Sequence, residues 1–206
     1  MAEPSAPYPM SLTIDYPDRE LNRLTTFFRL FTVIPIGIIL HLLSGASYSW
    51  NASSGSGWFL LFLPLVLMLL FRQKYPRWWF DWNVALLKLG TRVWVYLAML
   101  RDEYPSTDEE QAVHIDVPYP DAKADLNRWM PLVKWFLAIP HYIALLFLYI
   151  GTAVCIIIAW FAILFTGRYP RSLFDYVVGV QRWGLRVTVY MGLLTTDKYP
   201  PFSLKA

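Results

Sequence analysis

The chain contains one segment written twice, and this duplication constrains the fold more than any other feature of the sequence. Residues 74–100 read KYPRWWFDWNVALLKLGTRVWVYLAML, and residues 168–194 read RYPRSLFDYVVGVQRWGLRVTVYMGLL. The two segments align without a gap and are identical at 12 of 27 positions. Many of the differences keep the chemistry, as when Lys88 is matched by Arg182. An internal repeat of this kind predicts two copies of one structural unit.

Further matches extend the repeat toward the N-terminus at a constant spacing of 105 residues. The triplet Leu21-Asn22-Arg23 returns as Leu126-Asn127-Arg128, Arg29 returns as Lys134, and Ile34-Pro35 returns as Ile139-Pro140. We therefore predict a flexible N-terminus at 1–11, a first membrane repeat at 12–105, an acidic linker at 106–112 and a second membrane repeat at 113–206. The acidic residues just after the first copy are expected to be solvated.

The composition is that of a membrane protein. Hydrophobic residues make up 56% of the chain and charged residues only 16%, whereas a soluble domain has about 25% charged residues. Long apolar runs occupy Leu24–Leu43, Trp58–Phe71 and Leu132–Thr166. The N-terminus has neither the basic start nor the apolar core of a secretory signal, so we expect insertion to depend on these internal runs.

Each half is expected to place a helical hairpin in the membrane. Pro35 and Pro140 lie inside apolar runs, where a proline removes a backbone hydrogen bond and bends the helix. A polar loop at 44–57 separates the first proline-containing helix from a second helix at 58–71. In the second half the apolar run of 35 residues is long enough for two short spans, with Gly151-Thr152 as the predicted turn.

The duplicated segment is expected to form an amphipathic helix. Asp81, Lys88 and Arg92 fall on one narrow stripe of such a helix, and Asp175, Arg182 and Arg186 repeat the spacing. If these helices lie on the membrane surface, all four basic clusters fall on the cytoplasmic side, as the positive-inside rule favours. These clusters are Arg19/Arg23/Arg29, Arg72/Lys74/Arg77, Lys123/Arg128/Lys134 and Arg168/Arg171.

The sequence thus predicts an all-α integral membrane protein with four inserted helices, two interfacial helices and both termini in the cytoplasm. Each repeat would hold a short extended segment, a hairpin in the membrane and an interfacial helix. The alternative is an inverted repeat in which the duplicated helices also cross, giving six spans, an arrangement common among transporters.

The charged stripes are the most interesting constellation, with two interpretations. Lys and Arg at headgroup depth could hold anionic lipid, with tryptophans anchoring the helices in the interfacial zone. The anchors predicted are Trp78, Trp79, Trp82, Trp94 and Trp183. Alternatively, the stripes supply the wet or paired side of an amphipathic helix, and their duplication favours this architectural role, since catalysis needs one asymmetric constellation.

Two short alternating segments, SLTIDYP at 11–17 and AVHIDVP at 112–118, each end at a proline and are typical of edge strands. They are expected either to pair with each other or to add to the sheet of a neighbouring subunit.

Several function classes are not indicated. The net charge of +3 is too small to predict nucleic-acid binding, and the single Cys155 permits no intrachain disulfide. His41, His114 and His141 show no metal-ligand spacing, so we predict no metal and no cofactor. No phosphate-binding glycine loop or catalytic motif is present, and we predict no catalytic residues. His141, next to Pro140, could serve a proton or substrate path.

The recurring elements resemble a bacterial membrane-protein family known only as a domain of unknown function (DUF4389-like), here as two tandem repeats. They are the LNR triplet, the YPR-x-x-F-D corner, the G-x-R-V-x-V-Y core and a closing YP, with Leu185 replacing Thr91 in the second copy. The resemblance would cover nearly all of residues 13–202. It implies a bacterial inner-membrane location and supplies no activity.

The expected function is therefore that of a non-enzymatic structural or accessory subunit that assembles with itself or with a larger membrane complex. A sharper version is that the protein binds anionic lipid and bends the bilayer. The rival is a small transporter or lipid-handling protein with a site between the repeats, lined by Arg92, Arg186, Asp81 and Asp175. A membrane-embedded enzyme comes third.

Overall fold

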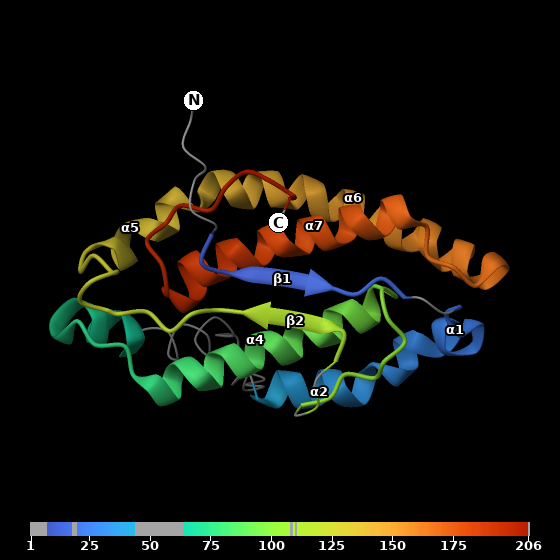
Figure 1. The fold of residues 1–206 in the computed structure, drawn as a ribbon, viewed down its shortest axis with the longest axis horizontal. Helices are drawn as coiled ribbons and strands as arrows, with labels where there is room; N and C mark the ends of the chain where they lie inside the picture. Colours follow the sequence, from blue (N-terminus) through green and yellow to red (C-terminus); the bar gives the residue numbers. More distant parts are fainter. Residues whose placement is uncertain (1–7, 18–19, 44–63, 108, 110, 206) are drawn as a thin grey trace, which may run out of the picture.

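The computed structural model describes residues 8–17, 20–43, 64–107, 109 and 111–205. It is mostly helical, and its elements are drawn in Figure 1. In the first half these are β1 (Ser11–Ile14), α1 (Arg23–Thr32), α2 (Ile34–Leu43), η1 (Met68–Arg72) and α4 (Arg77–Leu97). In the second half they are β2 (Val113–Asp116), α5 (Met130–Leu137), α6 (Ile139–Thr166), α7 (Arg171–Val187) and η2 (Thr188–Leu193). The elements η1 and η2 are short π-helical segments.

A two-stranded antiparallel sheet joins the halves. β1 pairs with β2 in the register Ser11 to Asp116 and Ile14 to Val113. The two extended segments therefore pair with each other within one chain, which was one of the two arrangements expected from the sequence. The structure describes the N-terminal segment from residue 8, and Met10 is buried, whereas residues 1–7 lie outside the described part.

The helices are arranged in order on either side of this sheet. Figure 1 shows α5 and α6 outermost on one side, then α7, β1, β2, α4 and finally α2 on the other side, with α1 at the right-hand end of the molecule. Contacts join α6 to α7, α7 to β1, α4 to β2 and α2 to α4, while α1 also reaches across to α6. Each strand therefore lies beside the duplicated helix of the opposite half.

Tyrosines after the strands fix the corners that precede the duplicated helices. The Tyr16 hydroxyl donates to the carbonyl of Tyr169 at 2.5 Å, and the Tyr119 hydroxyl donates to the carbonyl of Tyr75. Each bond joins one half to the other. Pro76 and Pro170 then occupy the N-cap positions of α4 and α7, where the missing N–H of proline costs nothing.

The two proline-containing helices break where expected. The helix ending at Thr32 is interrupted at Val33, two residues before Pro35, and the helix ending at Leu137 is interrupted at Ala138, two residues before Pro140. Asn22 of the LNR triplet caps α1, with its side-chain oxygen 2.9 Å from the Leu24 N–H. The triplet is thus a helix start signal.

The predicted turn at Gly151-Thr152 is wrong. α6 runs without interruption through 28 residues, and Thr152 is buried within it. Gly151 serves close packing instead, because a Cβ at this position would lie 2.5 Å from the hydroxyl oxygen of Tyr176 on α7. In the first half, the predicted loop at 44–57 and the first residues of the helix predicted at 58–71 lie outside the described residues.

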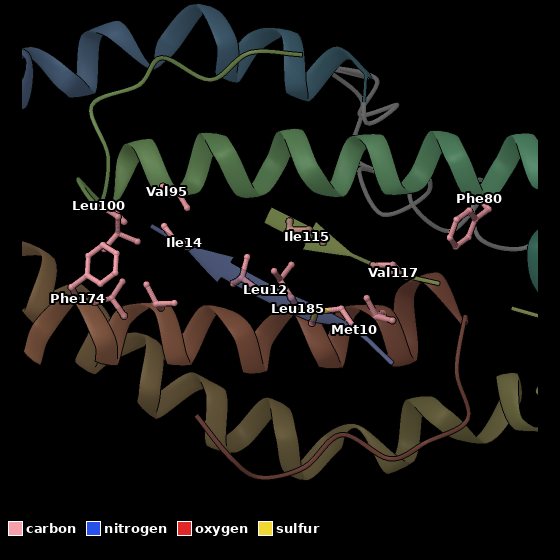
Figure 2. Packing of buried hydrophobic residues seen from close by; sticks show 14 of the residues in the cluster. Met10, Leu12, Ile14, Phe80, Val95, Leu100, Ile115, Val117, Phe174 and Leu185 are labelled. Carbon is pink, nitrogen blue, oxygen red and sulfur yellow. The ribbon is translucent and has the colours of Figure 1, made fainter. Parts of the chain in front are cut away.

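The main core lies between the sheet and the duplicated helices (Figure 2). Leu12 and Ile14 of β1 and Ile115 of β2 point into it, where they meet side chains such as Leu185 of α7. The alternating pattern of β1 leaves Ser11 and Thr13 exposed on the opposite face. The sheet is therefore apolar toward the helices and polar on its outer face.

Two helical stretches are long and apolar enough to span a membrane, namely Arg23–Leu43 and Ile139–Thr166. Only 17% of the most apolar window of each stretch is buried within the protein. On α6 the exposed apolar residues follow one face, including Ile143, Phe147, Ile150 and Val154. A soluble monomer rarely exposes so much contiguous apolar surface, so membrane association is indicated.

Candidate functional site

The arginines of the second charged stripe point into the protein. Arg182 donates from Nε to the Leu12 carbonyl at 3.1 Å and from Nη1 to the Leu204 carbonyl at 3.0 Å. Arg186 is buried, and its Nη1 and Nη2 donate to the carbonyls of Ser203 and Lys205 at 3.1 and 2.7 Å. The two guanidinium groups thus fasten β1 and the C-terminal segment to α7.

Burial governs the protonation of groups around these arginines. It lowers the pKa of Arg182 and Arg186, and the neighbouring charge of Arg182 lowers that of Arg186 further. Burial also raises the pKa of Tyr8, although the Arg186 charge opposes this, and the Tyr8 ring lies 5.9 Å from the Arg186 guanidinium carbon. A neutral phenol beside carbonyl-bonded arginines is a structural cluster rather than an anion site.

The first stripe is less enclosed. Arg92 donates from Nη1 to the Ser106 carbonyl at 2.7 Å, and Lys88 lies beside it along a shallow pocket next to the sheet. Among the described residues, Asp81 Oδ1 pairs with Nε of the exposed Arg77 on its own helix, at 3.4 Å, and Asp175 is exposed. The structure therefore does not bring Arg92, Arg186, Asp81 and Asp175 together into one site.

The predicted tryptophan anchors fall into two groups. Trp78 and Trp82 are exposed, and Trp79 and Trp94 are half-buried. Trp183 is buried and donates from Nε1 to His141 Nδ1 at 3.0 Å. The His141 ring also stacks on Phe202 with centroids 4.1 Å apart, so this histidine belongs to an aromatic cluster closed by the C-terminal segment.

Sequence reasoning missed a buried ion pair between Arg29 of α1 and Asp102. Only 2% of the Arg29 side chain and 11% of the Asp102 side chain are exposed. Arg29 also donates from Nη1 to the Tyr96 carbonyl at 3.1 Å, and its guanidinium carbon lies 4.5 Å from the centre of the Tyr96 ring. The second oxygen of Asp102 accepts the Asn22 N–H at 2.7 Å.

The same contacts occur in the second half. Lys134 Nζ lies 2.7 Å from Asp197 Oδ1, donates to the Thr196 carbonyl at 2.8 Å and sits 5.0 Å from the centre of the Tyr190 ring. Asp197 Oδ2 accepts the Asn127 N–H at 2.5 Å. In each half one carboxylate, Asp102 or Asp197, therefore accepts a backbone N–H at the start of the apolar helix and also pairs with the buried cation one or two turns further along that helix.

These pairs locate each apolar helix against the end of the duplicated segment. Because both cations are almost wholly buried, each requires its carboxylate to offset the loss of hydration. The sequence does contain a sign of these ion pairs, because Asp102 and Asp197 occupy the same place in the repeated motifs DEYP and DKYP. Asp102 was hidden among the neighbouring acidic residues, which read as a solvated run. In the part of the chain that the structure describes, no group of three His, Cys, Asp or Glu side chains could hold a metal ion.

Comparison with known proteins finds a partial family resemblance and no activity. Residues 128–203 match the family described as "Domain of unknown function (DUF4389)". No curated protein and no solved structure matches the chain. The match is narrower than the 13–202 expected from the motifs and covers α5, α6, α7 and the C-terminal segment. Residues 128–203 are therefore similar to the DUF4389 family, whose description assigns no activity.

Proposed function

We propose that the chain is a non-enzymatic membrane protein whose two related halves act as a scaffold on the cytoplasmic side of a bacterial inner membrane. One observation carries the proposal: the apolar faces of the candidate spanning helices are exposed, while the stripe arginines of α7 point inward to backbone carbonyls. Apolar surface that the protein leaves uncovered is available to lipid or to another membrane protein.

The polar outer face of the sheet supports a placement in which this face contacts water. Ser11, Thr13, His114 and Asp116 are exposed, and His114 lies 3.4 Å from Asp15 on the same surface. Polar groups facing hydrocarbon without partners cost several kcal/mol each. The sheet and the segments beside it therefore favour water, which on this proposal is the cytoplasm.

The pairing of α6 with α7 restricts how the helices meet the bilayer. The two helices pack antiparallel, with Tyr176 of α7 donating to the Leu148 carbonyl of α6 at 3.1 Å. They must share a tilt, so a steep α6 would carry α7 and the neighbouring sheet into the hydrocarbon region. We propose instead that α1, α2, α5 and α6 lie shallowly in the cytoplasmic leaflet, with their exposed apolar faces toward the acyl chains.

Such a body takes up space in one leaflet and would bend the membrane toward the cytoplasm. Self-association through exposed faces of α6, or packing against a larger complex, would concentrate the effect. The rival transporter receives less support, because the four charged residues that would line its site are separated and its arginines are bonded to carbonyls.

Membrane shape tests this proposal. The purified chain, added to phosphatidylglycerol-containing liposomes at high protein-to-lipid ratio, is expected to convert them into tubules or small vesicles visible by electron microscopy. Phe147→Glu places a charge on the exposed face of α6 and should abolish the effect. Asp175→Asn, at an exposed position of α7, is the matched control and should keep it. Unchanged liposomes with the parent chain would contradict bilayer shaping.

A further inference from the structure

A cavity of about 560 Å³ lies where the two halves meet, between α2, α4, α7 and η2. Its volume is within the range of about 300–1,000 Å³ typical of small-molecule sites. Leu40, Leu86 and Leu87 supply aliphatic wall, and Trp79 and Trp82 supply aromatic wall. No Asp, Glu, Lys or Arg is among the described residues that line it.

Glycines keep this space open. A Cβ added at Gly37 of α2 would meet no atom within 4 Å, and one added at Gly90 of α4 would meet only Leu40, at 4.0 Å. The match of Gly90 in the second copy is Gly184, where a Cβ would lie 2.2 Å from the Tyr149 hydroxyl oxygen. The space beside α7 is thus filled by the protein, whereas the corresponding space beside α4 is not.

One polar side chain on the cavity wall lacks a partner. Gln181 of α7 is only 9% exposed, and no hydrogen bond joins its amide to the described part of the chain. Its amide is therefore available to the cavity, where an occupant with a hydroxyl or carbonyl oxygen would form a hydrogen bond with it. The other polar side chains of the described wall are engaged: Tyr75, Asn83, Thr91 and Thr188 each donate to a backbone carbonyl, and His41 also has a partner. The wall therefore combines a large apolar surface with the Gln181 amide as a neutral group that can bond an occupant.

We propose that this cavity binds the long apolar chain of an uncharged lipid, a fatty alcohol or ester, with its oxygen bonded to the Gln181 amide. The described lining holds no Asp, Glu, Lys or Arg, and its one histidine, His41, already has another partner, so a free carboxylate or phosphate would enter without a dedicated counter-charge. Gly37 and Leu40 belong to the apolar stretch Arg23–Leu43, so an occupant can arrive from the membrane. The site goes beyond the scaffold role and does not depend on membrane bending.

Photolabelling of the full chain in detergent micelles tests the site. The probe is hexadecanol with a diazirine at mid-chain, and labelled residues are located by peptide mass spectrometry. We expect labelling on the cavity-lining parts of α2 and α4, together with labelling of the exposed face of α6 by bulk contact. Gly90→Phe fills the cavity and should lower labelling there about tenfold, while leaving that of α6 unchanged. Gly90→Ala is the matched control and should keep the cavity label.

Competition identifies the polar group of the occupant. Unlabelled hexadecanol should displace the cavity label, and Gln181→Leu should weaken that displacement about fivefold, the effect of one lost hydrogen bond. Hexadecane, which has no oxygen, should displace the cavity label equally well in the parent protein and in Gln181→Leu. Labelling confined to α6, a cavity label unaffected by Gly90→Phe, or palmitate competing as well as hexadecanol would overturn the proposal. If Gly90→Phe does not fold, Gly37→Leu fills the same space and gives the same decision.

Discussion

Removing the carboxylate of Asp102 is the most informative single change to the fold. In Asp102→Ala, Arg29 stays buried with one carbonyl and one aromatic ring as its partners, and the Asn22 N–H also loses its acceptor. Breaking a buried pair by removing one partner costs about 3–5 kcal/mol. In a chain of this length each kcal/mol shifts the melting temperature by about 2–4 °C, so a fall of roughly 6–20 °C is expected.

The assay is thermal unfolding of the detergent-solubilised protein, followed by circular dichroism and by loss of the monodisperse peak. Asp81→Ala is the matched control. The side chains of Asp81 and its partner Arg77 are 59% and 70% exposed, and exposed ion pairs contribute about 0–1 kcal/mol to the free energy of unfolding. The double change Arg29→Met with Asp102→Leu should recover most of the loss, since it leaves no unpaired charge. Equal melting temperatures for Asp102→Ala and Asp81→Ala would refute the reasoning.

Three further predictions follow from packing and protonation. Gly184→Ala should destabilise by about 1–3 kcal/mol in the same melting assay, and Tyr149→Phe should rescue it, because the next nearest ring atom is 3.4 Å from the new Cβ; failure of the rescue would contradict the packing argument. Asp197→Ala should cost less than Asp102→Ala, since Asp197 is 20% exposed and Lys134, unlike arginine, can lose its proton; a larger loss would argue against this ranking. Burial raises the pKa of Tyr75 above the ordinary tyrosine value of about 10, so the stability that its neutral hydroxyl contributes is complete below about pH 10 and is lost as the pH rises toward the higher pKa of the folded state. Tyr75→Phe should remove this part of the alkaline loss of stability, measured by thermal melting and by phenolate absorbance. An unchanged alkaline profile would contradict the prediction.

Local patterns in the sequence predicted local structure well. Alternation and the closing prolines located β1 and β2, and the prolines at 35 and 140 located the breaks between α1 and α2 and between α5 and α6. The duplicated segment became α4 and α7. Each of these features depends on neighbours in the chain, which a single sequence displays directly.

Features that depend on distant contacts were not predictable in the same way. Gly151 reads as a turn signal, yet its small size serves Tyr176, 25 positions later in the chain. Trp183 reads as an interfacial anchor, but Phe202 from the C-terminal segment covers it, with ring centroids 5.3 Å apart. The cavity beside Gly90 depends on what α2 and α7 leave unfilled, which no helical period reveals.

The orientation of the two halves is the central claim, and cysteine accessibility tests it most directly. Single cysteines replace Asp81 and Asp175, the exposed stripe positions of α4 and α7, in a chain carrying Cys155→Ala. A membrane-impermeant maleimide is applied to spheroplasts and to inverted membrane vesicles from the same bacterial cells. We predict that both positions react in inverted vesicles and that neither reacts in spheroplasts. Reaction of one position from each side would show that the halves are inverted and would contradict the account.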